Sequence, residues 1–125
     1  MKWRAIALVG CGLLQGCMTL QGYDGERRSV EELAHISGDP RVTAGSPVTA
    51  VLRQVDRLPL SVGQSSVDVL PGEHRLLVDC RVAETESVSR HALDVDVGAG
   101  RRYKLVADTA PGLRGCSAVR LEAAD

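Results

Sequence analysis

Four cysteines carry the most reactive side chains of this 125-residue sequence, and they fall into two pairs. Cys11 and Cys17 lie close together inside the most apolar stretch of the chain. Cys80 and Cys116 lie much further along. None of the four has the CxxC spacing of a redox-active pair, and no histidine is spaced beside a cysteine as in a zinc site. The chemistry to consider is therefore modification of a thiol near the start and a disulfide in the remainder.

The first sixteen residues have the composition of an export signal. The chain begins with a short basic segment, Met1–Arg4, and continues with Ala5–Leu14, ten residues without a charge. As a helix those residues would reach about 15 Å, half of a bilayer core, which is too short to span a membrane. A basic start, a short apolar region and a small residue before a cleavage site together predict a secretory signal peptide over residues 1–16.

The same stretch resembles the signal of bacterial lipoproteins, in which a lipobox of Leu, two mostly small residues and Cys is lipidated on the thiol and cleaved just before the cysteine. Cys11, which follows Leu8, is the closer match, because Gln15 stands at a usually small position before Cys17. Use of Cys11, however, would shorten the apolar region below its usual length and leave an odd thiol in the exported protein. The resemblance therefore predicts cleavage between Gly16 and Cys17 and lipidation of Cys17. The alternatives are an ordinary secretory signal and a buried N-terminal helix.

Lipidation would decide where the protein works. The resemblance implies three acyl chains, and several chains anchor a protein stably, whereas one gives only marginal membrane binding. In this family an Asp after the lipidated cysteine favours retention at the inner membrane of a Gram-negative cell, but this chain has Met18 there. We therefore expect a lipid-anchored protein of the cell outer membrane, on its periplasmic face.

Charge and aromatic content exclude some classes of ligand. Loss of residues 1–16 would leave 13 basic and 16 acidic residues, a mild and mixed charge that gives no footprint for nucleic acid. Phe is absent, and only Tyr23 and Tyr103 remain once Trp3 is removed. The chain therefore lacks a platform for stacking bases and a cage for a cation.

The segment after the lipidation site has two parts. Residues 17–28 contain two glycines and no apolar periodicity, which predicts a flexible tether of about 35 Å when extended. Residues 29–125 form the predicted domain. At its start, Ser29 and Glu32 have the capping-box spacing of a short helix, while Val30, Ala34 and Ile36 also fit an alternating strand.

The rest of the domain has the pattern of short β-strands, in which apolar and polar residues alternate between turn signals. The strand-like segments are 48–55, 58–60, 66–70, 75–80, 88–97, 103–107 and 116–122. Six or seven short strands with turns every 8 to 12 residues predict an all-β fold, a small antiparallel β-sandwich.

Three turn motifs resemble those of PEGA-type β-domains and their relatives in small bacterial envelope lipoproteins. They are Val55–Arg57, where Arg57 replaces the usual glycine, Val67–His74, which ends in "PGEH", and Gly100–Tyr103. The resemblance covers about half of the chain and implies an extracytoplasmic accessory domain with no catalytic residue to carry over.

The "PGEH" motif has a physical interpretation of its own. Pro71 fixes φ at the second position of a turn, and Gly72 supplies the positive φ that a type II turn requires at the third. His74 then begins the next strand. We predict a structural role for all three residues, with His74 as a ligand the alternative.

Other groups offer little chemistry. Cys80 and Cys116 are predicted to form a structural disulfide in the oxidising envelope, with two buried free thiols as the alternative. His35, His74 and His91 are scattered and predict no metal site. Two alternating acids, Asp94 and Asp96, suit the solvated face of a strand, and no nucleophile or base is adjacent to them.

The sequence thus favours a binding or scaffolding accessory of an envelope complex, with no cofactor and no catalytic residue. Its expected partners are membrane lipid, through the acyl chains, and a protein of the cell envelope. The alternative is an inhibitor or immunity-type lipoprotein that blocks a toxin or an envelope hydrolase. An enzyme is the least favoured class.

Overall fold

The computed structural model describes residues 19–39, 47–109 and 115–124. The predicted signal peptide, the predicted cleavage site after Gly16 and the predicted lipidation site, Cys17, lie outside these residues. The described residues form nine strands and one 3₁₀ helix, η1, with these bounds: β1 Thr19–Gln21, η1 Val30–Glu32, β2 Ala34–Ser37, β3 Val48–Val55, β4 Leu58–Pro59, β5 Ser66–Val69, β6 Gly72–Val82, β7 Ser87–Val97, β8 Arg102–Thr109 and β9 Cys116–Ala123. The predicted all-β fold is confirmed. No helix in the described segments is long and apolar enough to cross a membrane.

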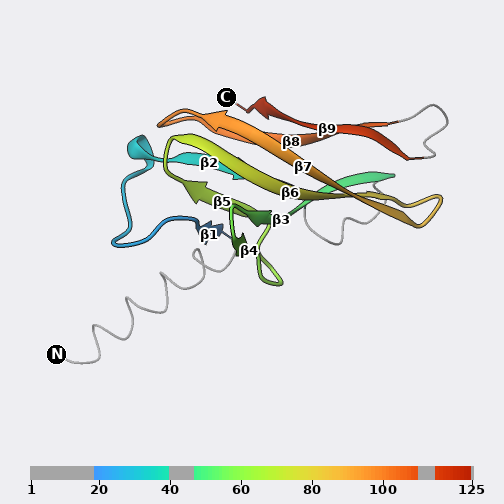
Figure 1. The fold of residues 1–125 in the computed structure, drawn as a ribbon, viewed down its shortest axis with the longest axis horizontal. Coiled ribbons are helices and arrows are strands. Elements are labelled where there is room, and N and C mark those ends of the chain that lie inside the picture. The colour runs from blue at the N-terminus through green and yellow to red at the C-terminus, as the bar shows by residue number, and fades with distance from the viewer. Residues whose placement is uncertain (1–18, 40–46, 110–114, 125) are drawn as a thin grey trace.

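Two sheets face each other to make the sandwich (Figure 1). The five-stranded sheet has the order β1-β5-β2-β8-β9, and the four-stranded sheet has the order β4-β3-β6-β7. The strands outnumber the predicted six or seven because β1, with three residues, is too short for an alternating pattern to identify it, and because the ambiguous segment 29–36 does contain a strand, β2. The predicted segment 58–60 is the short strand β4.

The five-stranded sheet is mixed, although an antiparallel sandwich was predicted. β1 runs parallel to β5, and β2 runs parallel to β8, while the other pairs of both sheets are antiparallel. Strands joined by a tight turn must run in opposite directions. Each parallel pair instead joins strands that are far apart in the sequence, so no hairpin fixes their relative direction.

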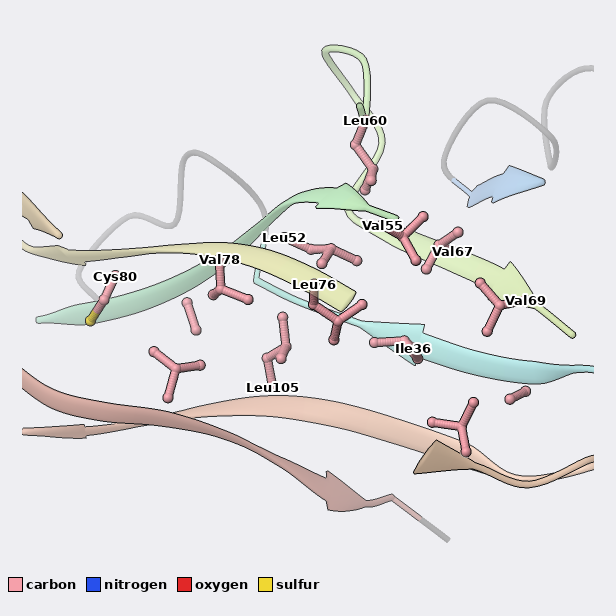
Figure 2. Close-up of a cluster of buried hydrophobic side chains, with 14 residues drawn as sticks. Ile36, Leu52, Val55, Leu60, Val67, Val69, Leu76, Val78, Cys80 and Leu105 are labelled. Carbon is pink, nitrogen blue, oxygen red and sulfur yellow. The ribbon is translucent and has the colours of Figure 1, made fainter. Parts of the chain in front are cut away.

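The core lies between the sheets and consists almost entirely of aliphatic side chains (Figure 2). Val67 and Ile36 come from the five-stranded sheet, and Leu52, Leu76 and Val78 come from the four-stranded sheet; each is at most 1% exposed. Burial of such side chains contributes about 1.5–3 kcal/mol each, and their period of two places them on one face of each strand. The alternation seen in the sequence therefore defines the core.

The chain enters the sheet earlier than predicted. Residues 17–28 were expected to form a tether, but Thr19–Gln21 is a strand whose residues pair with Ser66–Asp68. Leu20 packs against the core, and the Gly22 N–H donates to the carbonyl of Asp68 (2.8 Å). A three-residue strand has no detectable period, so its neighbours in space, not its own pattern, specify it. The folded domain therefore includes residue 19 and does not begin at residue 29.

The ambiguous segment 29–36 contains both predicted structures in succession. η1 comes first in the sequence. At its start, the Glu32 carboxylate accepts hydrogen bonds from the backbone N–H (3.4 Å) and the hydroxyl (3.1 Å) of Ser29. The strand β2 then begins at Ala34, with Ala34 and Ile36 fully buried. The capping signal and the alternating signal were both correct, each for its own half of the segment.

Candidate functional site

The two sides of the sandwich end in very different strands. On one side the edges are β1 and β4, which have three and two residues. On the other side they are β7 and β9, which have eleven and eight residues and lie next to each other across the two layers (Figure 1). Short edge strands protect a sheet from unwanted pairing. The long β7 and β9 instead present, on their outer edges, rows of backbone N–H and C=O groups that no other strand among the described residues pairs with.

A groove of about 380 Å³ lies between these two long edges. Its apolar lining includes Leu93 and Val95 of β7, Tyr103 of β8 and Leu121 of β9. All four side chains are partly buried and pack against the core, so the groove is an open continuation of the core at the edge of the sandwich. An added chain would bury apolar surface there in addition to pairing with the backbone.

The basic residue of the groove is already neutralised. Arg120 donates hydrogen bonds to the carboxylates of Glu122 and Asp108, the latter at 3.1 Å. These hydrogen bonds, first to Glu122 and then to Asp108, raise the pKa of the Arg120 guanidinium. The positive charge of Arg120 is therefore balanced by Asp108 and Glu122 of the same sheet.

The acidic residues of the groove are not neutralised in this way. Asp94 and Asp96 are exposed on β7, and both line the groove. In the ladder with β6, Asp94 lies opposite Arg75 and Asp96 lies opposite Glu73, and no ion pair joins these side chains. The rim beside β7 thus carries a local excess of negative charge.

The predicted disulfide is confirmed, and it joins the two layers. Cys80 of β6 is bonded to Cys116, the first residue of β9, with their Cα atoms 6.4 Å apart. The Cys80 side chain lies at one end of the core (Figure 2) and is 1% exposed. The bond therefore fixes the start of β9 against the four-stranded sheet, and neither cysteine lines the groove.

Two of the turn motifs meet in one hydrogen-bonded corner. Asp56, in the turn between β3 and β4, accepts hydrogen bonds from the His74 ring (Nδ1 to Oδ2, 2.7 Å) and from the Arg75 backbone N–H (2.9 Å). The other ring nitrogen of His74 lies 2.6 Å from the carbonyl oxygen of Leu70. Both ring nitrogens are therefore engaged within the fold, and neither is left for a ligand.

The backbone of these turns explains their residue types. Gly72 has φ +121°, and no atom lies close enough to exclude a side chain, so conformation and not space requires glycine there. Pro71 precedes it as the bend that leads into β6. In the other turn the positive φ falls on Asp56, at +53°, and not on Arg57, so the sequence tolerates Arg57 where related motifs have glycine.

The remaining histidines stay apart. His35 pairs with Asp68 through Nδ1 (2.7 Å), and His91 lies 3.0 Å from the Ser89 hydroxyl. No group of three or more histidine, cysteine or acidic side chains suited to a metal occurs among the described residues.

Comparison of the chain with protein-family models, with curated protein sequences and with solved structures found no match. The PEGA-like character of the domain therefore stays a prediction that depends on its three turn motifs.

The sequence did not identify the groove. The alternation of Leu93 and Val95 with Asp94 and Asp96 predicted a strand with one solvated face, and that strand is β7. Its position at the edge of the sheet is a property of the strand order, which the alternation does not encode.

Proposed function

We propose that this chain is a lipid-anchored accessory protein of the bacterial envelope that binds an extended segment of a partner protein along β7. The observation that carries the proposal is the contrast between the two sides of the sandwich: among the described strands, the long edges are β7 and β9, and both lie on the same side. Strand addition at a free edge supplies backbone hydrogen bonds, and a flanking groove supplies side-chain specificity.

The charge of the groove specifies the chemistry of the partner. An extended segment that pairs with β7 would place alternate side chains beside Asp94 and Asp96, which form no ion pair with any residue that the structure describes. Lysine or arginine at those positions would neutralise both carboxylates, and small aliphatic residues between them would enter the groove against Leu93 and Val95. We therefore propose a basic, alternating segment of an envelope protein as the occupant.

The anchor is proposed from the sequence. Cys17, in the lipobox-like motif, is the proposed site of three acyl chains, and Met18 supports the outer membrane as the destination. Thr19 is already in the sheet, so the attachment would lie two residues from the fold, within about 7 Å. The domain would then rest at the lipid surface and would not be held away from it by a long tether.

Photocrosslinking tests this proposal in cells that produce the full chain. A crosslinking residue replaces Ala92, an exposed position of β7, and a matched one replaces Lys104, an exposed position of β8. We expect a covalent product with one envelope protein from position 92 and none from position 104. Mass spectrometry of the product should map the captured peptide to an extended, basic segment.

A charge reversal supplies the specific control. Asp94→Lys with Asp96→Lys should abolish the product from position 92, because the altered rim would repel a basic segment. Glu26→Lys with Glu84→Lys makes the same change in net charge at exposed positions outside the groove and should leave the product intact. Equal products from both positions, an acidic captured peptide, a product that contains two copies of this chain, or insensitivity to the Asp94 and Asp96 changes would each contradict the proposal.

A further inference from the structure

A second hollow, on the outer face of the five-stranded sheet, is lined by four arginines. It has a volume of about 310 Å³. Arg27 and Arg28 come from the segment that connects β1 to η1, while Arg101 and Arg102 come from the turn before β8 and the first residue of β8. Arg27 and Arg28 are thus far in the sequence from Arg101 and Arg102, and the fold brings the two basic pairs to one site.

Backbone hydrogen bonds hold these segments in place. The Arg28 N–H donates to the Tyr23 hydroxyl (3.0 Å), which closes the segment after β1. On the other side, the His35 N–H donates to the carbonyl of Arg101 (3.0 Å), and the Gly100 N–H donates to the carbonyl of Leu33 (2.8 Å). The backbone positions of the four arginines are therefore fixed by the fold.

The pocket has a large excess of positive charge. Its lining includes one carboxylate, Asp68, which is already hydrogen-bonded to the His35 ring (Nδ1 to Oδ1, 2.7 Å). None of the four guanidinium groups forms an ion pair or a side-chain hydrogen bond with another described residue.

Acids on the neighbouring segments leave this excess in place. Glu32 is hydrogen-bonded to Ser29. Glu26 and Glu31 are exposed and do not line the pocket. Four unpaired like charges around one hollow repel one another, and a bound anion would remove that repulsion.

We propose that this pocket binds a phosphate group. Guanidinium groups bind phosphate through paired N–H donors, and a phosphate has enough oxygens to engage several arginines at once, whereas one carboxylate has only two. The lining also includes Leu33, which is buried, and Val30, which is 72% exposed at the rim. A phosphate that carries a short apolar portion therefore fits better than a free inorganic ion.

The position of the pocket favours a phospholipid headgroup as the source of the phosphate, an inference that relies on the proposed anchor. Asp68 pairs with Gln21 of β1, and His35 pairs with Asp68, so the pocket is two strand spacings from β1. Cys17 precedes Thr19 by two residues, so the pocket would lie within about 20 Å of the acylated cysteine. A headgroup of the same leaflet is within that reach, and a phosphorylated solute of the periplasm is the other source.

Two titrations of the purified full-length lipoprotein test the proposal, with the ¹⁵N signals of the arginine side chains as the readout. In the first, the protein is held in a non-ionic detergent and inorganic phosphate is added. In the second, the protein is placed in nanodiscs of zwitterionic lipid, with or without phosphatidylglycerol. We expect phosphate to shift a subset of arginine signals saturably, and phosphatidylglycerol to shift the same subset without added phosphate.

Paired variants distinguish a site from general charge. Arg101→Gln with Arg102→Gln should weaken phosphate binding at least about tenfold, because the change removes two charged donors from the pocket. Arg57→Gln with Arg75→Gln removes the same charge from exposed positions outside the pocket and should leave the affinity unchanged.

The two titrations distinguish the source of the phosphate. Shifts by phosphate in detergent that phosphatidylglycerol does not reproduce would support the pocket and identify a soluble phosphorylated ligand as its source. Absence of saturable shifts in both titrations, or equal weakening by the two variant pairs, would overturn the proposal. The detergent titration does not depend on β7 or on acylation, so failure of the proposed function would leave it interpretable.

Discussion

At the scale of single residues, Asp56 links two turns, because its carboxylate in the β3–β4 turn hydrogen-bonds His74 and Arg75 at the start of β6. Burial alone would raise the pKa of this carboxyl. The hydrogen bonds from the Arg75 backbone and from His74 outweigh burial, and the pKa of Asp56 lies below the ordinary value of 3.8. A carboxyl whose pKa is lowered by folding stabilises the protein above its ordinary pKa. That contribution is lost as the pH falls through the lowered value.

Asp56→Asn should therefore lower the free energy of unfolding at pH 7 by about 1 kcal/mol, a discounted value because the side chain is half-exposed. The difference between parent and variant should shrink as the pH falls from about 4 to 2, since the parent then loses its charged form. Urea unfolding across this pH range measures it, with Asp24→Asn, at an exposed position, as the control. A difference that stays constant down to pH 2 would contradict the role of the charge.

The disulfide gives a second test at the residue scale. Cys80→Ala should lower stability by about 4 kcal/mol under oxidising conditions, because the bond closes a loop across a sequence separation of 36. Cys116→Ala should match it, and a reductant should bring the parent close to both variants. Melting curves with and without reductant check the prediction. A parent that melts like its variants without reductant would show that the bond contributes no stability.

The sequence predicted these residues to different degrees. The Cys80–Cys116 bond follows from cysteine parity once Cys11 and Cys17 are assigned to the N-terminal segment. The bond between Asp56 and His74 does not follow from the sequence, because nothing local to either turn indicates that the two turns meet.

At the scale of elements, most strands could be placed from the sequence, and β1 could not. β3 has the predicted bounds, Val48–Val55, because its β-branched residues favour an extended backbone, although four consecutive residues are buried and a bulge between Leu52 and Gln54 interrupts the alternation. β1 has three residues and depends on β5 for its hydrogen bonds, so no local signal marks it. The strand order, and with it the exposed β7 edge, is set by long-range pairing and lies beyond what a local pattern encodes.

The assignment of β1 to the sheet can be measured directly. Leu20 packs against the core, so Leu20→Ala should lower the free energy of unfolding by about 1–2 kcal/mol, below the cost at a fully buried site. Val62, which is 84% exposed, provides the control, and Val62→Ala should change stability by less than about 0.5 kcal/mol. If the two variants were equally stable, residues 19–21 would be a tether after all.

At the scale of the whole molecule, the proposed anchor and the proposed binding edge lie on opposite sides. β1 and β4 form one side of the sandwich, and β7 and β9 form the other (Figure 1). An anchor two residues before β1 would turn that side toward the lipid, where Leu58 of β4 and Val62 are exposed. The groove beside β7 would then face away from the bilayer, open to a partner in the periplasm.

Anchoring predicts a simple change in location. Cys17→Ser should leave an unprocessed or soluble precursor, because no thiol remains at the proposed cleavage site to accept lipid. Fractionation of cells with an antibody to the domain measures this, and Cys11→Ser is the matched control that should stay membrane-bound. A Cys17→Ser protein that is processed and retained in the membrane like the parent would count against the anchor.

The most direct test of the account is the mass of the natural protein extracted from membranes. We predict a chain that begins at Cys17, with residues 1–16 absent and three acyl chains on the first residue. A chain that retains residues 1–16, or one with an unmodified Cys17, would contradict it.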